Sequence, residues 1–285
     1  MAPASDRPSA TIPSTSPVEA LDIGTHARQD PEPGLALCLS GGGYRAMLFH
    51  VGTLWRLYET GYLSQLSRIS SVSGGSITAG VLGLNWSNLR FAPTPVMEDF
   101  TTHVVSPIRR LASKTIDAAS VVSGVLLPGS VSDKVTAAYR KYVFGEATLQ
   151  ALPDHPRFVM NATNVQSGVL WRFMKPYMRD YRVGEVRQPT VALAVAVAAS
   201  SAFPPVLSPV SFEVDADAYT PNSGTDLQHE PFTTDVVLTD GGVYDNLGLE
   251  TAWKRYQTIL VSDAGGKTGR KRSRNMIGPV IPIGC

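Results

Sequence analysis

The sequence predicts an α/β protein of three layers, in which a mostly parallel β-sheet is sandwiched between helices. Residues 35–40 form a short apolar run that ends in three glycines, and a helical pattern and a second strand at residues 68–72 follow. Strand, helix and strand in this order make a βαβ unit, which implies parallel strands and a right-handed crossover. Glycine-rich turns also follow the strands that end near Val72 and Leu238.

The other elements are predicted in chain order from the spacing of apolar residues. Residues 44–60 carry apolar side chains at helical spacing, with Gly61 as the stop, and residues 77–84 form a second helix after the Ser73-Gly74-Gly75 turn. Residues 91–152 have a helical pattern broken by Pro and Gly and include an apolar piece at 121–127. Further strands are expected at 157–161, 169–173, 234–238 and 258–262, and a buried helix of small apolar residues at 190–200.

Length, charge and cysteine content exclude several classes of protein. The 285 residues are enough to bury a sizeable core, and the net charge of +1 gives no general field that would attract nucleic acid. Two cysteines, one of them the last residue, exclude a disulfide framework and a cysteine-based zinc site. The five histidines also lack the paired spacing of a metal site. We therefore expect no metal ion and no organic cofactor.

Three segments are predicted. Residues 1–33 are rich in Pro, Ser, Thr and Ala and form a disordered lead without the apolar core of a secretory signal. Residues 34–266 form one domain, and residues 267–285 form a basic tail, either disordered or aberrant. The most apolar run, 191–199, is roughly half the ~20 residues that a bilayer requires. The expected location is cytoplasmic, with peripheral contact to membranes as an option offered by the 121–127 piece and the basic tail.

Three glycine-rich turns carry the candidate chemistry. Ser73 lies on a sharp strand-to-helix turn that would raise its hydroxyl above the sheet edge, where the positive end of the helix dipole lies. The amides of Gly41, Gly42 and Gly43 can hold an anion or a developing oxyanion. Asp240 ends a strand and can serve as a base. An acyl-transfer enzyme needs this combination of nucleophile, base and oxyanion hole.

Each turn also has a plainer interpretation, since Ser-Gly-Gly, Gly-Gly-Gly and Asp-Gly are common turn sequences without chemistry. Two nucleotide-binding alternatives fail on spacing. The first glycine loop lacks an acid at the end of the next strand, and the Gly265-Gly266-Lys267-Thr268 segment has Val261 where a phosphate-binding loop requires glycine. The chain order Ser, acid, His is also unavailable with Asp240 as the acid, because the last histidine is His229.

The sequence resembles the patatin-like phospholipases, acyl hydrolases with a Ser-Asp dyad. The resemblance extends from about residue 35 to residue 266 and rests on five blocks. Ser71, within one block, and Ala46, directly after another, are small residues at positions where the family often has glycine. The blocks are Ser40-Gly41-Gly42-Gly43-Tyr44-Arg45, Ser71-Val72-Ser73-Gly74-Gly75, Asn161-Ala162-Thr163-Asn164, Ala199-Ser200-Ser201-Ala202-Phe203-Pro204-Pro205 and Asp240-Gly241-Gly242-Val243-Tyr244-Asp245-Asn246.

The resemblance implies a role for each matching residue. Ser73 would be acylated, Asp240 would be the base, Gly41–Gly43 would form the oxyanion hole, and Arg45 would lie nearby to bind substrate or an anion. The implied activity is hydrolysis of carboxylic esters of lipids, phospholipids or lysophospholipids first, without a cofactor. The alternative is a catalytically silent relative that keeps the fold and binds a lipid or acyl group.

Overall fold

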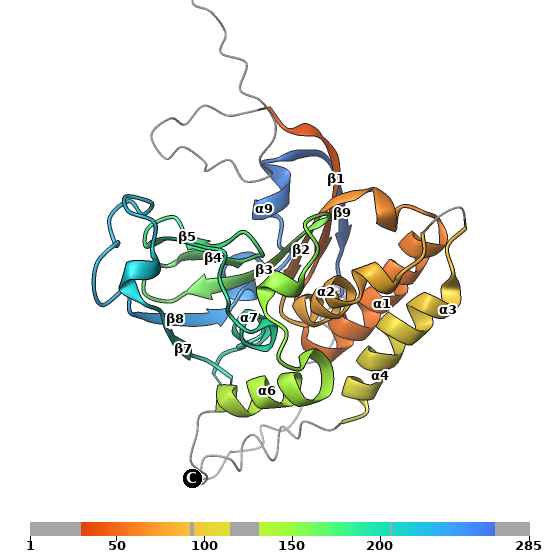
Figure 1. Cartoon of the computed structure of the whole chain (residues 1–285), viewed down its shortest axis with the longest axis horizontal. Helices are drawn as coiled ribbons and strands as arrows, with labels where there is room; N and C mark the ends of the chain where they lie inside the picture. The colour runs from red at the N-terminus through yellow and green to blue at the C-terminus, as the bar shows by residue number, and fades with distance from the viewer. Residues whose placement is uncertain (1–29, 92–93, 115–130, 206, 266–285) are drawn as a thin grey trace, which may run out of the picture.

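A nine-stranded sheet organises the parts of the chain that the computed structural model describes, residues 30–91, 94–114, 131–205 and 207–265 (Figure 1). Along the sheet the strands run in the order β6-β5-β4-β3-β2-β1-β9, and β8 pairs with both β3 and β7. Their bounds are β1 Glu32–Leu39, β2 Leu66–Val72, β3 Arg157–Asn164, β4 Val169–Phe173, β5 Tyr177–Asp180, β6 Gly184–Arg187, β7 Val210–Glu213, β8 Asp235–Asp240 and β9 Tyr256–Ser262.

The predicted α/β fold with a parallel central sheet is confirmed. Strands β9, β1, β2 and β3 are parallel neighbours, and the glycine loop, the Ser73 turn and the first two helices all belong to this part. The strands beyond β3 pair antiparallel and extend the sheet on one side. Strand β8 is among them, so the turn at Asp240 does not follow a parallel strand.

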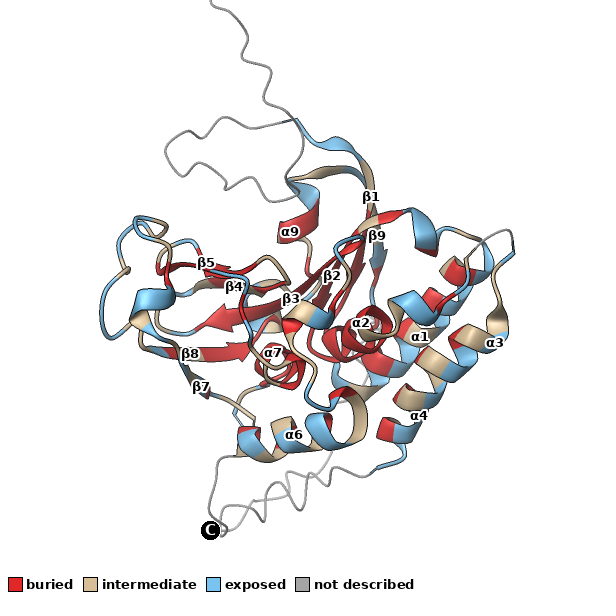
Figure 2. Ribbon diagram, in the orientation of Figure 1, coloured by how far each residue is buried: buried red, intermediate tan, exposed pale blue. Residues whose placement is uncertain are grey.

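Helices cover both faces of the sheet. They are α1 Gly43–Glu59, α2 Gly74–Leu84, α3 Met97–Phe100, α4 Ser106–Ala112, α6 Val131–Tyr139, α7 Leu193–Ser200, α8 Gly242–Asp245 and α9 Glu250–Trp253. Helix α2 is buried along almost its whole length and α7 nearly so, whereas α1 and α6 expose one side (Figure 2). No helix of the described ranges is both long and apolar enough to cross a bilayer.

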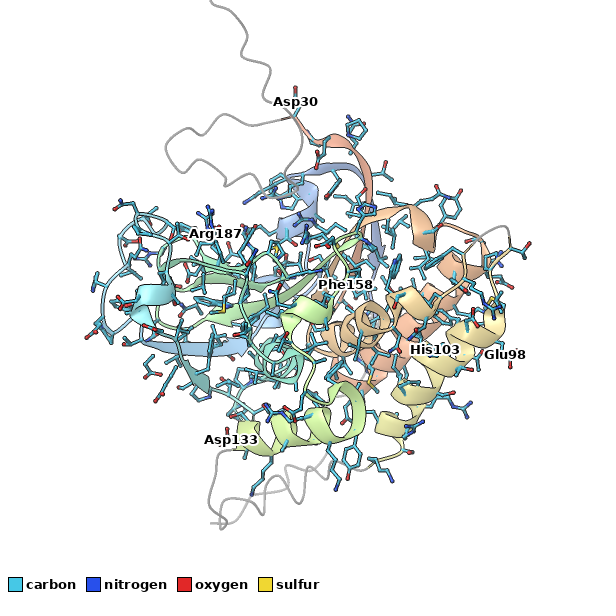
Figure 3. All side chains as sticks on the ribbon, in the orientation of Figure 1. Asp30, Glu98, His103, Asp133, Phe158 and Arg187 are labelled. Carbon is cyan, nitrogen blue, oxygen red and sulfur yellow. The ribbon has the colours of Figure 1, made fainter. Side chains whose placement is uncertain are left out.

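Strand β1 shows how its alternating side chains serve two layers. Leu37 and Leu39 belong to the main core with α1 and α2, while Ala36 and Cys38 pack on the opposite face against Ala252 of α9. This alternation is expected of a strand buried on both faces. Phe158 of β3, near the middle of Figure 3, is only 1% exposed and packs with Trp86 in the main core.

Most predicted elements are present within a few residues of their expected bounds. Strand β1 begins at Glu32, so Glu32 and Pro33 lie in a strand although the sequence placed them in the lead. Strands β5, β6 and β7 and the short helices α8 and α9 were not predicted. The apolar piece 121–127 and the tail 267–285 lie outside the described residues, as does most of the lead.

The start of α2 is packed directly against the backbone at the end of β1. A Cβ atom added at Gly75 would lie 2.5 Å from the Leu39 carbonyl oxygen and 2.8 Å from that of Ser40. Real Cβ atoms do not approach backbone oxygens so closely, and backbone cannot move aside as a flexible side chain can. The absence of a side chain at Gly75 is therefore a condition for placing Ser73 beside the glycine loop.

We expect Gly75→Ala to destabilise the protein by about 1–3 kcal/mol, the usual range for overpacking a close contact. Gly52→Ala in α1 is the matched control, because a Cβ there meets nothing within 4 Å. Alanine favours a helix over glycine by roughly 1 kcal/mol, so the control should keep or raise stability. Urea unfolding of both variants measures the difference, and equal stabilities would contradict the packing argument.

Candidate active site

Ser73 occupies a strained position between β2 and α2. Its backbone angles are φ 53° and ψ −121°, a region that non-glycine residues rarely adopt and that costs on the order of 1–3 kcal/mol. Gly74 and Gly75 follow it, and a Cβ at Gly74 would collide with the Gly43 carbonyl oxygen. The residue is 6% exposed. This geometry is that of a serine elbow, as the sequence predicted for this turn.

Asp240 reaches the level of Ser73 although its strand runs antiparallel to β3. Strand β3 extends past the end of β2, and β8 pairs with only the last three residues of β3, with Asp240 opposite Ala162. Asn161, one residue earlier, is the register partner of Val72, which immediately precedes Ser73. Strand β8 therefore ends where β2 ends, and the two turns meet from opposite chain directions.

The Asp240 carboxylate is buried and only half satisfied. Oδ1 accepts a hydrogen bond of 2.7 Å from the Gly242 backbone N–H, and Oδ2 has no hydrogen-bond partner among the described residues. Burial raises the pKa of this carboxyl above its usual value, and the Gly242 N–H and the Ser73 hydroxyl act to lower it. The two side chains are thus close enough to influence each other without a formed hydrogen bond. Such contacts are often loose in enzymes without substrate.

Ser200, the last residue of α7, joins the two turns. Its Oγ accepts a hydrogen bond of 3.1 Å from the Ser73 backbone N–H and lies 2.6 Å from the Asn161 carbonyl oxygen, to which it donates. Its own carbonyl accepts a 3.2 Å bond from the Gly241 N–H, next to Asp240. Ser76 Oγ, one turn into α2, lies 2.8 Å from the same hydroxyl. One buried residue therefore holds both the serine turn and the aspartate turn.

The glycine loop lies between β1 and α1 and is open to solvent at two of its three positions. The Gly41 N–H is used within the fold, since it donates a 2.9 Å bond to the Asn246 carbonyl. Gly42 and Gly43 are exposed, have φ of 133° and 63°, and donate to no acceptor among the described residues. These two amides are therefore available to an anion. Arg45, in the first turn of α1, is exposed and has no ion pair in the described parts of the chain.

No described histidine contacts Ser73 or Asp240. His50 is completely buried, with Nε2 donating to the Ser40 carbonyl at 2.9 Å and Nδ1 accepting from Ser262 Oγ at 2.8 Å. Both ring nitrogens are thus occupied, and burial lowers the pKa of this imidazole. His155 and His229 are exposed. His50 fixes the strand end before the glycine loop and has no free nitrogen with which to act as a base.

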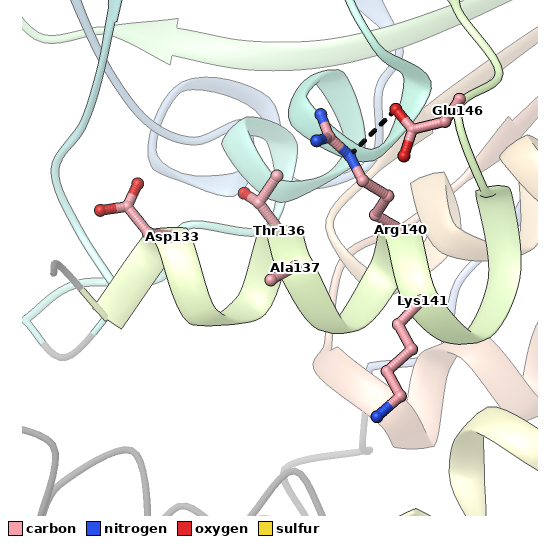
Figure 4. Close-up of a pocket in the computed structure, with 6 residues that line it drawn as sticks. All are labelled: Asp133, Thr136, Ala137, Arg140, Lys141 and Glu146. Carbon is pink, nitrogen blue, oxygen red and sulfur yellow. Dashed lines mark ion pairs between the residues drawn. The ribbon is translucent and has the colours of Figure 1, made fainter.

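Other surface features do not include the predicted site residues. A shallow depression beside α6 is lined by Asp133, Thr136, Ala137, Arg140, Lys141 and Glu146, with an ion pair between Arg140 and Glu146 (Figure 4). A second, among residues 216–229, is polar. Within the described ranges no three histidine, cysteine or acidic side chains gather in a way that could hold a metal ion.

Sequence reasoning missed the residues that position the site. Ser200, Ser76 and Asn246 make the contacts that fix the three turns, and Asn161 Nδ2 ties β3 to the Ser70 hydroxyl and the Ser71 carbonyl, at 2.9 Å each. The available signal was weak: Ser200 and Asn246 stand in blocks quoted for the family resemblance, and Ser200 ends an otherwise apolar helix.

Comparison with solved structures finds a similar fold in a human cytosolic phospholipase A2. Human GIVD cytosolic phospholipase A2 superposes with a TM-score of 0.50 at 14% identity, covering 80% of this chain and 45% of that chain. The same enzyme in complex with methyl gamma-linolenyl fluorophosphonate gives a TM-score of 0.40 at 17% identity, over 59% of this chain and 29% of that one. VipD from Legionella pneumophila gives 0.36 at 16% identity, over 76% and 47%. This chain thus spans less than half the length of these proteins.

A search of curated protein sequences found no significant match. The family model described as patatin-like phospholipase, however, matches residues 37–253, well over half of the chain. That range contains the glycine loop, the Ser73 turn, α7 and the Asp240 turn. The chain therefore belongs to the patatin-like phospholipase family.

Proposed function

We propose that this chain is a lipid acyl hydrolase that cleaves carboxylic esters of phospholipids or lysophospholipids through a Ser73–Asp240 dyad. The observation that carries the proposal is the strained Ser73 turn beside a buried carboxylate whose second oxygen has no partner in the described part of the chain. A fold tolerates backbone strain and an unsatisfied buried charge only where other contacts enforce them, and such features concentrate at functional sites. Membership of the family supports the same reaction class.

In the first step Ser73 Oγ attacks the ester carbonyl carbon while its proton passes to Asp240 Oδ2. The carbonyl oxygen becomes an oxyanion, and the free Gly42 and Gly43 amides, at the start of α1, donate hydrogen bonds to it. The adjacent start of α2 adds the positive end of a second helix dipole. The intermediate then collapses, the alcohol leaves with the proton from Asp240, and Ser73 is left acylated.

In the second step water replaces the alcohol. Asp240 takes a proton from the water, whose oxygen attacks the acyl-enzyme, and collapse releases the fatty acid and returns the proton to Ser73. Arg45 lies two residues after Gly43 and is exposed, so its guanidinium can meet the phosphate of a phospholipid at the mouth of the site. The chain's own groups therefore supply nucleophile, base and oxyanion stabilisation.

Ser73→Ala should abolish ester hydrolysis, by about 10⁴-fold or more, because it removes the hydroxyl that the proposed mechanism acylates. A fluorophosphonate probe should label the unaltered protein at Ser73, identified by peptide mass spectrometry. Ser201→Ala is the matched control, since Ser201 bonds to the Val197 carbonyl at 2.7 Å and not to the site. A folded protein whose Ser73 is never labelled and which hydrolyses no lipid ester would instead be a silent lipid-binding relative.

Asp240→Asn should reduce turnover about as severely as loss of the nucleophile, and it should stabilise the fold at neutral pH. Because burial raises the folded pKa, the ionised carboxylate opposes folding above that pKa, and the neutral amide removes this effect. The gain should shrink as the pH falls through the raised folded pKa and should be gone below the unfolded value of about 3.9. Thermal unfolding at several pH values measures it. A folded His155→Gln or His229→Gln variant as inactive as Asp240→Asn would replace the dyad by a triad, because neither residue supports the glycine loop.

Ser200→Ala should lower kcat by about 10- to 100-fold with little change in KM, because misplacing Ser73 affects chemistry more than binding. It should also slow fluorophosphonate labelling of Ser73. The Ser201→Ala variant makes the same chemical change one residue after the end of α7, at a side chain that does not contact the Ser73 turn, and should retain kcat. Equal kcat values for the two variants would contradict a positioning role for Ser200.

A further inference from the structure

Three arginines gather at the end of the sheet opposite the Ser73 turn. Arg68 near the start of β2 and Arg157 at the start of β3 are register partners, so their side chains leave neighbouring strands on the same face. Arg255 immediately precedes β9, and its charge acts on Arg68. The Tyr256 ring lies beneath Arg68, whose guanidinium carbon is 5.6 Å from the ring centroid. We call Arg68, Arg157 and Arg255 the arginine cluster.

The cluster is buried with its hydrogen-bond capacity largely unused. Arg68 and Arg157 are each 5% exposed, and Arg255 is half-buried. Arg68 donates from Nη1 to the Thr251 carbonyl at 3.2 Å, but its Nε has no partner among the described residues. Arg157 has two buried donors, Nε and Nη1, that also have no hydrogen-bond partner among the described residues. Buried guanidinium N–H groups without acceptors destabilise the folded state, so we expect a bound acceptor to take their hydrogen bonds.

No acidic side chain in the described parts of the chain forms an ion pair with the cluster. Asp154 acts on Arg157 electrostatically, but its carboxylate is paired with Lys175 at 3.1 Å and faces solvent. By contrast, Arg179 on the same sheet face has Glu185 as a buried counter-charge at 3.5 Å. Burial lowers the pKa of Arg157 and of Arg255, and the field of Arg68 acts in the same direction. The cluster thus carries about three positive charges without a counter-ion among residues whose placement the structure describes.

We propose that the arginine cluster is a binding site for a phosphoryl oxyanion. A guanidinium group can donate two parallel hydrogen bonds to two oxygens of one phosphate group. Three guanidinium groups match the charge of a phosphoryl group, which can carry two negative charges, better than the single charge of a carboxylate. Tyr177 and Tyr256 lie close enough to Arg157 and Arg255 to interact with both charges and can add hydroxyl donors. The phosphoryl group can belong to a soluble phosphate compound or to a phosphomonoester lipid headgroup.

This site is distinct from the one proposed for ester hydrolysis. Arg68 lies four residues before Val72 along β2, which corresponds to roughly 13 Å of strand. The two sites also use different faces, since the main core with α2 and α7 lies on one side of the sheet and α9 on the other. The inference therefore does not depend on the proposed hydrolase activity.

The test is thermal unfolding of the full chain with inorganic phosphate or pyrophosphate against chloride at the same ionic strength. We expect phosphate to raise the unfolding midpoint, on the order of 5 °C at about 100-fold above the dissociation constant. Arg157→Gln should lose this response and, without phosphate, should unfold at a higher temperature because it removes an unpaired charge. Arg110→Gln, which makes the same charge change on an exposed position of α4, is the matched control and should respond like the unaltered protein.

Vesicle sedimentation separates the two sources of the phosphoryl group. Binding to vesicles with phosphatidic acid but not to phosphatidylcholine alone, lost in Arg157→Gln, identifies a lipid headgroup, whereas stabilisation by phosphate without vesicle binding identifies a soluble ligand. If Arg157→Gln does not fold, the half-buried Arg255→Gln takes its place. The proposal is wrong if phosphate gives no more stabilisation than chloride, or if both arginine variants respond as the control does.

Discussion

The hydrogen bond from the Ser73 backbone N–H to Ser200 Oγ fixes the part of the structure on which the proposed chemistry depends. It gives a partner to a backbone N–H at a strained turn that would otherwise be unsatisfied. Because the Ser200 carbonyl also accepts from Gly241, a shift of α7 would displace the serine and the aspartate together. Their relative position is therefore set by one rigid, buried helix end and does not rely on a direct bond between the two side chains.

The glycine loop is held by a second set of contacts on the other side of Ser73. His50 bonds the Ser40 carbonyl, Asn246 accepts from the Gly41 N–H, and Gly74 lies against the Gly43 carbonyl. These contacts hold the backbone of the loop in place through the Ser40 carbonyl and the Gly41 N–H. The Gly42 and Gly43 N–H groups take no part in them and stay free for a ligand. Preorganised donors of this kind need no rearrangement when charge develops, which is the basis of oxyanion stabilisation.

The sequence was sufficient for the parallel half of the sheet and for the three glycine turns, because both depend on local patterns. It was insufficient for β5 and β6, four-residue strands that carry Arg179, Asp180, Glu185 and Arg187 and read as polar loops. It was also insufficient for Ser200, whose partners Ser73 and Asn161 are 127 and 39 residues away. Strand direction at β8 was likewise invisible, since a short strand before Asp-Gly-Gly looks the same in either orientation.

Unsatisfied buried groups differ in what they imply. A neutral donor such as the Trp171 indole N–H, also without a described partner, costs about 1–3 kcal/mol, which a domain of this size can absorb. A buried ionisable group without a partner can instead lower this cost by changing its protonation state and becoming neutral. Asp240 can do so, and its raised pKa makes it ready to accept and release a proton. Arginine cannot, since it stays protonated at any physiological pH. The same defect therefore supports the proposed proton transfer at Asp240 and the proposed anion site at Arg68 and Arg157.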